Sequence, residues 1–131
     1  HLSWPENGFH AQYDRLHRWA QERQASDGAG TLLCGDFNIA AGSDAFRHIV
    51  ETGGFEEQML KIRRPAEFHR VFREEPRTDS TQALAGDGRI DFIWLNTGSR
   101  LRAIAAEELF TAEDYGRVSD HTGYLVEFEL R

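Results

Sequence analysis

The sequence holds a single cysteine in 131 residues, and this scarcity excludes two kinds of architecture. Cys34 has no second cysteine to pair with, so neither an internal disulfide nor a zinc site built on cysteines is possible. A lone cysteine is compatible with a reducing compartment, and we expect a cytoplasmic location. Long hydrophobic runs are also missing. No stretch approaches the roughly 20 apolar residues of a membrane-spanning helix, so we expect no membrane span.

Positive charge is scarce as well. Fifteen lysines and arginines face 22 aspartates and glutamates, which gives a formal net charge of -7. Because non-specific DNA binding depends on cations that neutralise phosphates, an acidic chain is a poor default nucleic-acid binder. One basic stretch lies between residues 63 and 77, and we interpret it as a solvated face balanced by neighbouring glutamates. Its arginines are Arg63, Arg64, Arg70, Arg73 and Arg77.

What the sequence does contain is enough apolar material for one compact domain. Hydrophobic residues make up 40% of the chain and aromatic residues 11%, which is typical of a globular protein with a core. Apolar residues recur at helical spacing over residues 9–25 and predict an amphipathic helix. Ser43 is placed to cap a second, short helix that runs to about Glu51 and stops at the glycine pair 53–54.

Strands are predicted from the apolar stretches 31–34, 89–95 and 124–130, and residues 101–106 and 109–110 are assigned to a strand next to 89–95. The first is short and almost wholly apolar, so we expect a strand buried on both faces with Cys34 in the core. The charged, proline-containing stretch 56–82 is interpreted as loop with short helical pieces. Helices and strands that alternate along the chain predict a mixed layer structure, of the α/β (α+β) class.

Polar residues stand where these apolar stretches end or are interrupted. Asp36 and Asn38 follow the first strand two residues apart, so their side chains point the same way and are expected to share a target. Asp91 lies inside an apolar run, where a carboxylate is costly without a partner. His121, preceded by Asp120, opens the last strand, and Asp91 is the natural carboxylate to orient its imidazole and stabilise its protonated form.

Each of these motifs also has an ordinary structural explanation. Asp-x-Asn is common in turns, where the side chain bonds its own backbone. A buried aspartate beside Arg89 fits a salt bridge, and Ser-Asp-His is a frequent turn sequence. Three such groups in one small domain nevertheless favour a site, because carboxylates bind hard cations, an amide positions an oxygen and histidine transfers protons.

The motifs "GDFN", "RIDFIW" and "SDH", in this order over residues 35–121, resemble the endonuclease/exonuclease/phosphatase superfamily, the DNase I-like phosphoesterases. "HLSW" at the start is similar to the Asn-Thr-His-Leu strand end of that family, which makes His1 the histidine of the motif. The longer stretches "HLSWPENGFHAQYDRL" and "RVSDHTGYLVEFEL" are similar to a bacterial branch that includes maltose-phosphate phosphatase-like proteins.

This resemblance implies a role for each matching residue. Asp36 would align or deprotonate the attacking water, Asn38 would bind a phosphate oxygen, and His121 would contact the phosphate and exchange a proton. Asp91 would orient His121, and His1 would face the phosphate from the opposite lobe. The resemblance further implies Mg²⁺, with Mn²⁺ as the other choice. The implied catalytic set is His1, Asp36, Asn38, Asp91 and His121, and the metal-side carboxylates are Asp36 and Asp120.

Members of the family fold as a four-layer α/β/β/α sandwich of two similar halves, and the first half supplies an asparagine and a metal-binding glutamate before the histidine motif. The resemblance therefore implies that residues 1–131 are one α/β half, the C-terminal half, of such a domain. We expect the chain alone to bind Mg²⁺ weakly and to be nearly inactive. We also expect self-association through the sheet face that the other half would cover.

Three functions remain open at this stage. The first is Mg²⁺-dependent hydrolysis of a phosphate mono- or diester of a small molecule by in-line attack of water, which the acidic balance favours. The second is a nuclease acting on DNA or RNA, which would need the arginines of residues 63–77 as its basic surface. The third is an inactive half-domain or interaction module.

Overall fold

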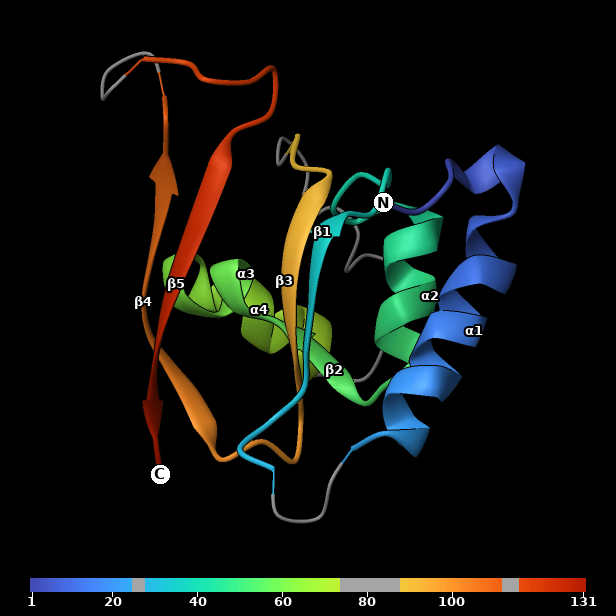
Figure 1. Ribbon diagram of the computed structural model, residues 1–131, viewed down its shortest axis with the longest axis horizontal. Coiled ribbons are helices and arrows are strands. Elements are labelled where there is room, and N and C mark those ends of the chain that lie inside the picture. The colour runs from blue at the N-terminus through green and yellow to red at the C-terminus, as the bar shows by residue number, and fades with distance from the viewer. Residues whose placement is uncertain (25–27, 74–87, 112–115) are drawn as a thin grey trace.

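The computed structural model describes residues 1–24, 28–73, 88–111 and 116–131, and it shows helices, a small sheet and a separate hairpin (Figure 1). The expected mixed α/β class is confirmed. In chain order the elements are η1 Pro5–Asn7, α1 Phe9–Glu22, β1 Leu32–Asp36, α2 Asp44–Thr52, β2 Phe55–Glu57, α3 Gln58–Arg63, α4 Pro65–Phe72, β3 Asp91–Asn96, β4 Leu101–Leu109 and β5 Gly123–Leu130.

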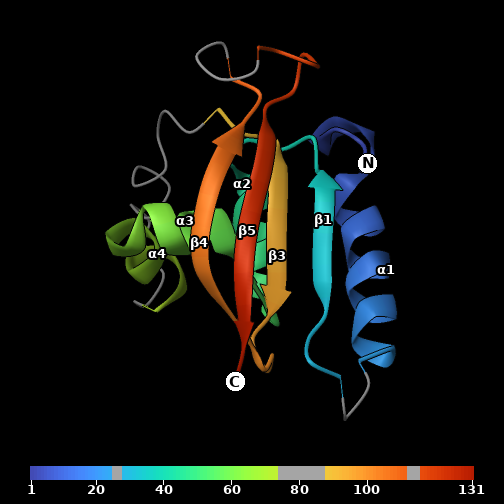
Figure 2. The ribbon, with the colours of Figure 1, turned by 60° about the vertical axis from the view of Figure 1, so that its left-hand side comes forward.

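The sheet has the strand order β1-β3-β2, and its neighbouring strands are antiparallel. In this register Cys34 lies opposite Ile93, and Asp36 lies opposite Asp91. Strands β4 and β5 form a second, two-stranded antiparallel sheet, and this hairpin lies beside β3 in both ribbon views (Figures 1 and 2). The register places two aspartates side by side at one end of the three-stranded sheet.

The two predicted N-terminal helices are confirmed, with small shifts at their ends. Helix α1 follows Gly8, whose φ of 96° is in the left-handed region that glycine adopts freely. Helix α2 begins after Ser43, and the backbone N–H of Phe46 donates to the Ser43 hydroxyl at 3.2 Å, as a helix cap requires. It ends at Gly53, the first glycine of the predicted stop.

An aromatic core fixes which way the strands face. Phe92 and Trp94 of β3 are buried, and their rings lie 5.6 and 5.3 Å from the Phe46 ring of α2. Such packing of large rings contributes strongly to stability. Because side chains alternate along a strand, turning Phe92 and Trp94 toward the helices turns Asp91 and Ile93 to the opposite face. The core thereby decides where the carboxylate of Asp91 points.

The expectation that the first strand is buried on both faces is wrong. Leu33 is buried, whereas Leu32 is 41% exposed and Cys34 is also exposed. The reason is that β1 lies at the edge of the sheet, paired only with β3 among the described strands, while α1 and α2 cover a single face. Cys34 is therefore not a core residue. Partial burial raises the pKa of its thiol, so the structure does not activate it as a nucleophile.

The interpretation of residues 56–82 as loop with short helical pieces is confirmed for the helices α3 and α4, whereas the strand β2 at the start of this stretch was not predicted. Residues 74–82 lie outside the described part of the chain. Two of the charged residues in this stretch, Glu56 and Glu57, are buried and partnered. Glu56 pairs with Lys61 at 2.9 Å, and Glu57 caps α3 by accepting the N–H of Leu60 at 2.6 Å. Sequence alone does not show that a carboxylate will be buried with its partner.

Candidate active site

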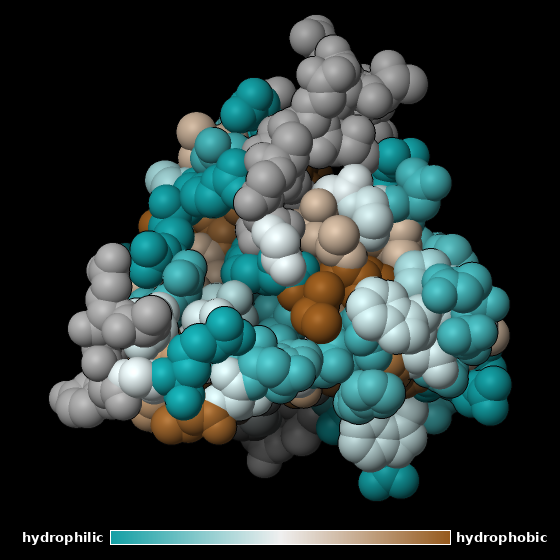
Figure 3. Space-filling view, turned by 90° about the horizontal axis from the view of Figure 1, so that it is seen from above, coloured by the Kyte–Doolittle hydropathy of each residue, from teal (hydrophilic) through white to brown (hydrophobic). Residues whose placement is uncertain are grey.

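Four distant segments of the chain meet at one end of the sheet. The end of β1, the starts of β3 and β5 and the N-terminal residues all lie at the top of Figure 1. The Leu2 N–H donates to the carbonyl of Asp36 at 2.9 Å, and the Phe37 N–H donates to the carbonyl of Ile90 at 2.9 Å. Seen from above, this end of the molecule is largely hydrophilic, with an apolar patch near its middle (Figure 3). Every predicted site residue belongs to one of these four segments.

The contact at the centre of this end joins Asp91 to His121. Nδ1 of His121 donates to Oδ2 of Asp91 over 2.6 Å, with the side chains 38% and 25% exposed, respectively. This hydrogen bond and the charge of Asp91 raise the pKa of the imidazole, and the charges of Asp120 and Asp36 add to the effect. Because Nδ1 is held by the carboxylate, Nε2 is the ring nitrogen left to meet a substrate.

The loop before β5 is ordered by its own hydrogen bonds. The backbone N–H of His121 donates to the hydroxyl of Ser119 at 3.1 Å, and that hydroxyl donates to Oδ1 of Asp120 at 3.2 Å. The guanidinium of Arg117 donates to the carbonyl of Asp120 at 2.8 Å. These bonds hold the backbone of His121 in place while its side chain contacts Asp91. They also leave the Asp120 side chain exposed at the surface.

Asp36 and Asn38 form both a local turn and a shared contact. The N–H of Asn38 donates to Oδ1 of Asp36 at 2.7 Å, and Asn38 has a φ of 52°, a left-handed conformation that asparagine tolerates. The side-chain amide of Asn38 donates to the carbonyl of Leu2 at 2.7 Å and lies 3.0 Å from Nε2 of His1. Since an amide nitrogen only donates, Nε2 of His1 is the acceptor.

His1 completes this group from the other side. Its Nε2 lies 4.0 Å from Oδ2 of Asp36, and its side chain is 76% exposed. Asp36 and Asn38 thus converge on His1, while Asp91 of the neighbouring strand contacts His121. The group of three residues and the Asp91–His121 pair therefore stand next to each other, because Asp36 and Asp91 are direct partners across β1 and β3.

The two predicted metal-side residues do not by themselves form a complete metal site. Carboxylate oxygens of Asp36 and Asp120 are the right kind of ligand for Mg²⁺. Among the residues that the structure describes, however, no group of three or more histidine, cysteine, aspartate or glutamate side chains is arranged to hold a metal ion. The donors fit the cation in kind but not in number, so no chemical step is assigned to a metal here.

Sequence reasoning missed two groups that shape this end of the molecule. Arg117 and Ser119 order the loop of His121, and both lie inside the stretch "RVSDH", where the polar residues were read only as a motif. Arg89 was considered from the sequence only as a salt-bridge partner of Asp91, but it pairs with the buried Glu57 at 3.4 Å, and its guanidinium lies 5.5 Å from the Phe92 ring. The position of Arg89 directly before an apolar run was the one sequence feature that could have predicted this buried ion pair.

Comparison with known proteins decides the family. The model of the endonuclease/exonuclease/phosphatase family matches residues 1–121. The chain belongs to this family. The matched range contains every residue of the predicted site, and it places the chain in a superfamily of phosphoesterase- and nuclease-type hydrolases. Searches of curated proteins and of solved structures found no match. In the described part of the chain, no helix is long and apolar enough to cross a membrane.

Proposed function

We propose that this family member is a Mg²⁺-dependent phosphoesterase, with Mn²⁺ as the other candidate ion, that hydrolyses a phosphate ester of a small molecule. The observation that carries the proposal is the 2.6 Å contact between Asp91 and His121 at the meeting point of four chain segments. A carboxylate that holds one nitrogen of an imidazole leaves the other nitrogen oriented for proton transfer. Such a pair is what ester hydrolysis needs.

The chemistry assigns one proton transfer to this pair. Hydrolysis forms a bond between a water oxygen and phosphorus and breaks the bond between phosphorus and the ester oxygen, which leaves with the electron pair and needs a proton. His121 in its protonated form donates from Nε2 toward the phosphoryl group or the leaving oxygen. Asp91 favours that protonated form by raising the pKa of the imidazole. A positioned proton donor contributes about 10²–10⁴ in rate.

Asp36, Asn38 and His1 are proposed to act on the other side of the phosphate. Oδ1 of Asp36 is engaged by the backbone of Asn38, so Oδ2 is the oxygen proposed to align the attacking water. The amide of Asn38 is engaged by Leu2 and His1, and binding a phosphate oxygen would require it to exchange one of these partners. His1, which is exposed, is proposed to face the phosphate.

A bound Mg²⁺ would supply charge neutralisation at the phosphoryl oxygens. Asp36 and Asp120 would hold part of its coordination sphere, and the remaining ligands would come from outside the described residues. We propose on this ground that the chain is one half of a larger catalytic domain, the C-terminal half, and that the exposed face of β1 packs against the other half.

The nuclease alternative is supported less well by the arginines between residues 63 and 77. Arg73 forms an ion pair with the buried Glu56, and Arg64 pairs with Glu67 at 3.7 Å. These two ion pairs lower the net positive charge of the surface, which makes it less suited to a long polynucleotide. Duplex DNA binding whose affinity falls steeply with salt would favour the nuclease.

The decisive experiment compares two aspartates that each contact a histidine. In the full-length protein, Asp91→Asn removes the charge that orients His121, and we expect kcat to fall by about 10²-fold or more, within the range for a proton-transfer group. The matched control is Asp14→Asn, because Asp14 contacts His48 at 2.7 Å between α1 and α2, away from the site. Equal kcat values for wild type and Asp91→Asn would show that the Asp91–His121 pair has no catalytic role.

A further inference from the structure

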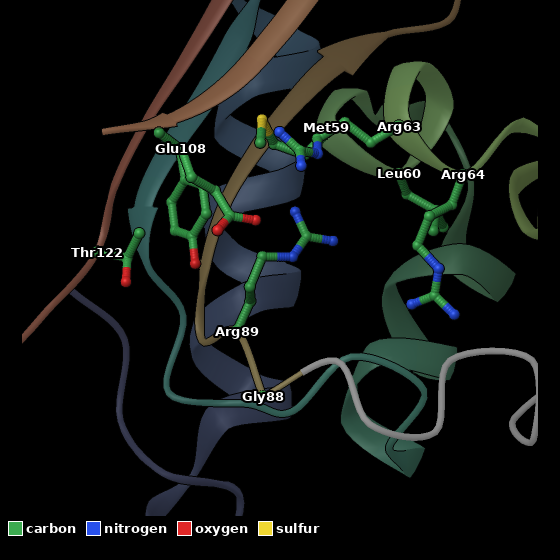
Figure 4. A pocket seen from close by; sticks show the side chains of 9 residues that line it. Met59, Leu60, Arg63, Arg64, Gly88, Arg89, Glu108 and Thr122 are labelled. Carbon is green, nitrogen blue, oxygen red and sulfur yellow. The ribbon is translucent and has the colours of Figure 1, made fainter. Parts of the chain in front are cut away.

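A cavity of about 540 Å³ opens between α3, the residues that lead into β3 and the β4–β5 hairpin (Figure 4). Its size is within the range of pockets that hold small molecules. Arginines dominate its polar lining. Figure 4 shows the side chains of Arg63 and Arg89 reaching toward its interior and the carboxylate of Glu108 entering from the hairpin. None of the catalytic roles proposed above uses this cavity.

The lining carries an excess of positive charge in an otherwise acidic chain. Among the residues that the structure describes, Arg63, Arg64 and Arg89 bring three guanidinium groups to the cavity wall, and Glu108 brings one carboxylate. Arg89 is held in place by the buried Glu57 at 3.4 Å. Arg63 is exposed, and no hydrogen bond or ion pair engages it within the described residues. The cavity therefore presents guanidinium donors to whatever enters it.

The cavity adjoins the Asp91–His121 pair through the chain itself. Arg89 precedes Asp91 by two residues, and Thr122, another lining residue, directly follows His121. Two lining residues of the cavity thus lie within two positions of the Asp91–His121 pair. The guanidinium group matches the geometry of a phosphate oxygen pair better than any other side chain does.

We propose that this cavity binds a second phosphate group of the substrate, next to the ester on which the Asp91–His121 pair acts. The inference rests on the proposed function and narrows its substrate to a small molecule that carries two phosphate groups. A polynucleotide would also offer neighbouring phosphates, but the chain has a net charge of -7 and the arginines line one half-open cavity instead of an extended track.

The test is a titration of the chain with inorganic pyrophosphate at fixed ionic strength, followed by the NMR shifts of the Gly88 and Thr122 amides, which lie in the cavity wall. We expect Arg63→Gln and Arg64→Gln each to weaken binding by about 5- to 10-fold, as loss of one charge-assisted contact does. Glu108→Gln should strengthen binding, because it removes the opposing charge.

Two controls match these substitutions in charge but lie elsewhere. Arg18→Gln changes an exposed arginine of α1. Glu107→Gln changes the residue next to Glu108, and the Glu107 side chain points to the other face of β4. Both should bind pyrophosphate as the wild type does. The proposal would be overturned if Arg63→Gln and Glu108→Gln left the pyrophosphate affinity unchanged, or if Arg18→Gln lowered it as much as Arg63→Gln does.

A second binding experiment distinguishes the phosphates of a small molecule from those of a polynucleotide. A short single-stranded oligonucleotide should bind more weakly than pyrophosphate and without dependence on Arg63; tighter, Arg63-dependent oligonucleotide binding would overturn the small-molecule assignment. Asp91→Asn separates this inference from the proposed function. It leaves the cavity lining intact, so it should keep pyrophosphate binding even though it removes hydrolysis.

Discussion

Asp91 would destabilise an apolar strand if its charge had no partner, and His121 supplies that partner across 30 positions of sequence. The sequence alone identified Asp91 as a candidate site residue because a carboxylate inside "RIDFIW" interrupts the apolar pattern. The contact itself depends on the Ser119 and Arg117 hydrogen bonds that shape the following loop. Cys34 illustrates the opposite case, since an apolar neighbourhood in sequence predicted burial and the residue is exposed.

The pKa of His121 tests the contact with Asp91. Asp91 raises the pKa of its imidazole, so Asp91→Asn should lower that pKa toward the ordinary histidine value. Because the raised pKa belongs to the folded state, the stabilisation from the pair is present in full below the unfolded-state pKa. It is lost as the pH rises through the folded-state value.

NMR titration of the histidine ring protons measures the His121 pKa directly in wild type and variant. His48, whose partner is Asp14, serves as an internal reference that Asp91→Asn should leave unchanged. A His121 pKa that is the same in both proteins would contradict the charge contact. Unfolding free energies measured at several pH values should differ most between the two proteins at the acidic end and converge at alkaline pH.

At the scale of the elements, the sequence predicted a helix cap only where the capping residue is one of the common N-cap types, such as serine. Ser43 before an apolar-periodic stretch predicted the start of α2 correctly. Glu57 also caps a helix, yet its carboxylate is fully buried and bonds the N–H groups of Met59 and Leu60. Burial raises the pKa of this carboxyl against the opposing effect of Arg89. Because Glu57 stands in a charged stretch of the sequence, its role as a buried helix cap was not predicted.

We therefore predict that removing the Glu57 side chain destabilises the fold more than removing the Ser43 hydroxyl. Ser43→Ala should cost about 1 kcal/mol, the usual value for a helix cap. Glu57→Ala removes a cap and also one charged partner of the mostly buried Arg89, and losing one partner of a buried ion pair costs about 3–5 kcal/mol. Urea denaturation measures both losses.

Glu51→Ala is the control, because Glu51 is an exposed residue of α2 and its loss should change the free energy of unfolding by less than about 0.5 kcal/mol. Similar losses for Ser43→Ala and Glu57→Ala would mean that the buried ion pair contributes little. That outcome would also weaken the argument that Glu57 holds Arg89 in the wall of the cavity.

At the scale of the whole molecule, the described strands leave apolar side chains uncovered. Leu32 of β1 is 41% exposed, and Leu125 of β5 is 39% exposed. Strand β1 is also an edge strand, with hydrogen-bonding groups on one side that no other described strand engages. Exposed apolar strands with a free edge are common sites of association. This arrangement suits a sheet face that packs against another layer.

We predict that the isolated chain self-associates at high concentration through this surface. Leu32→Lys and Leu125→Lys should each shift the equilibrium toward monomer, because a charge at an edge or on an exposed sheet face opposes pairing. Sedimentation velocity over a range of concentrations measures the effect. Trp19→Lys changes an apolar residue of α1 that is more exposed, at 53%, and it should leave association unchanged. A greater effect of Trp19→Lys would place the contact on the helical face instead.

The sequence by itself determined the mixed α/β class, the existence of the helices predicted at 9–25 and from Ser43 to about Glu51, and the three motifs that carry the family. It could do so because periodicity, caps and charges inside apolar runs are local features. Only the tertiary structure decided which face of β1 is open, that Glu56 and Glu57 are buried, and that arginines gather around a cavity beside His121. Those outcomes depend on which distant segments meet, since burial of a charge or exposure of an apolar side chain is set by its partners in space and not by its neighbours in sequence.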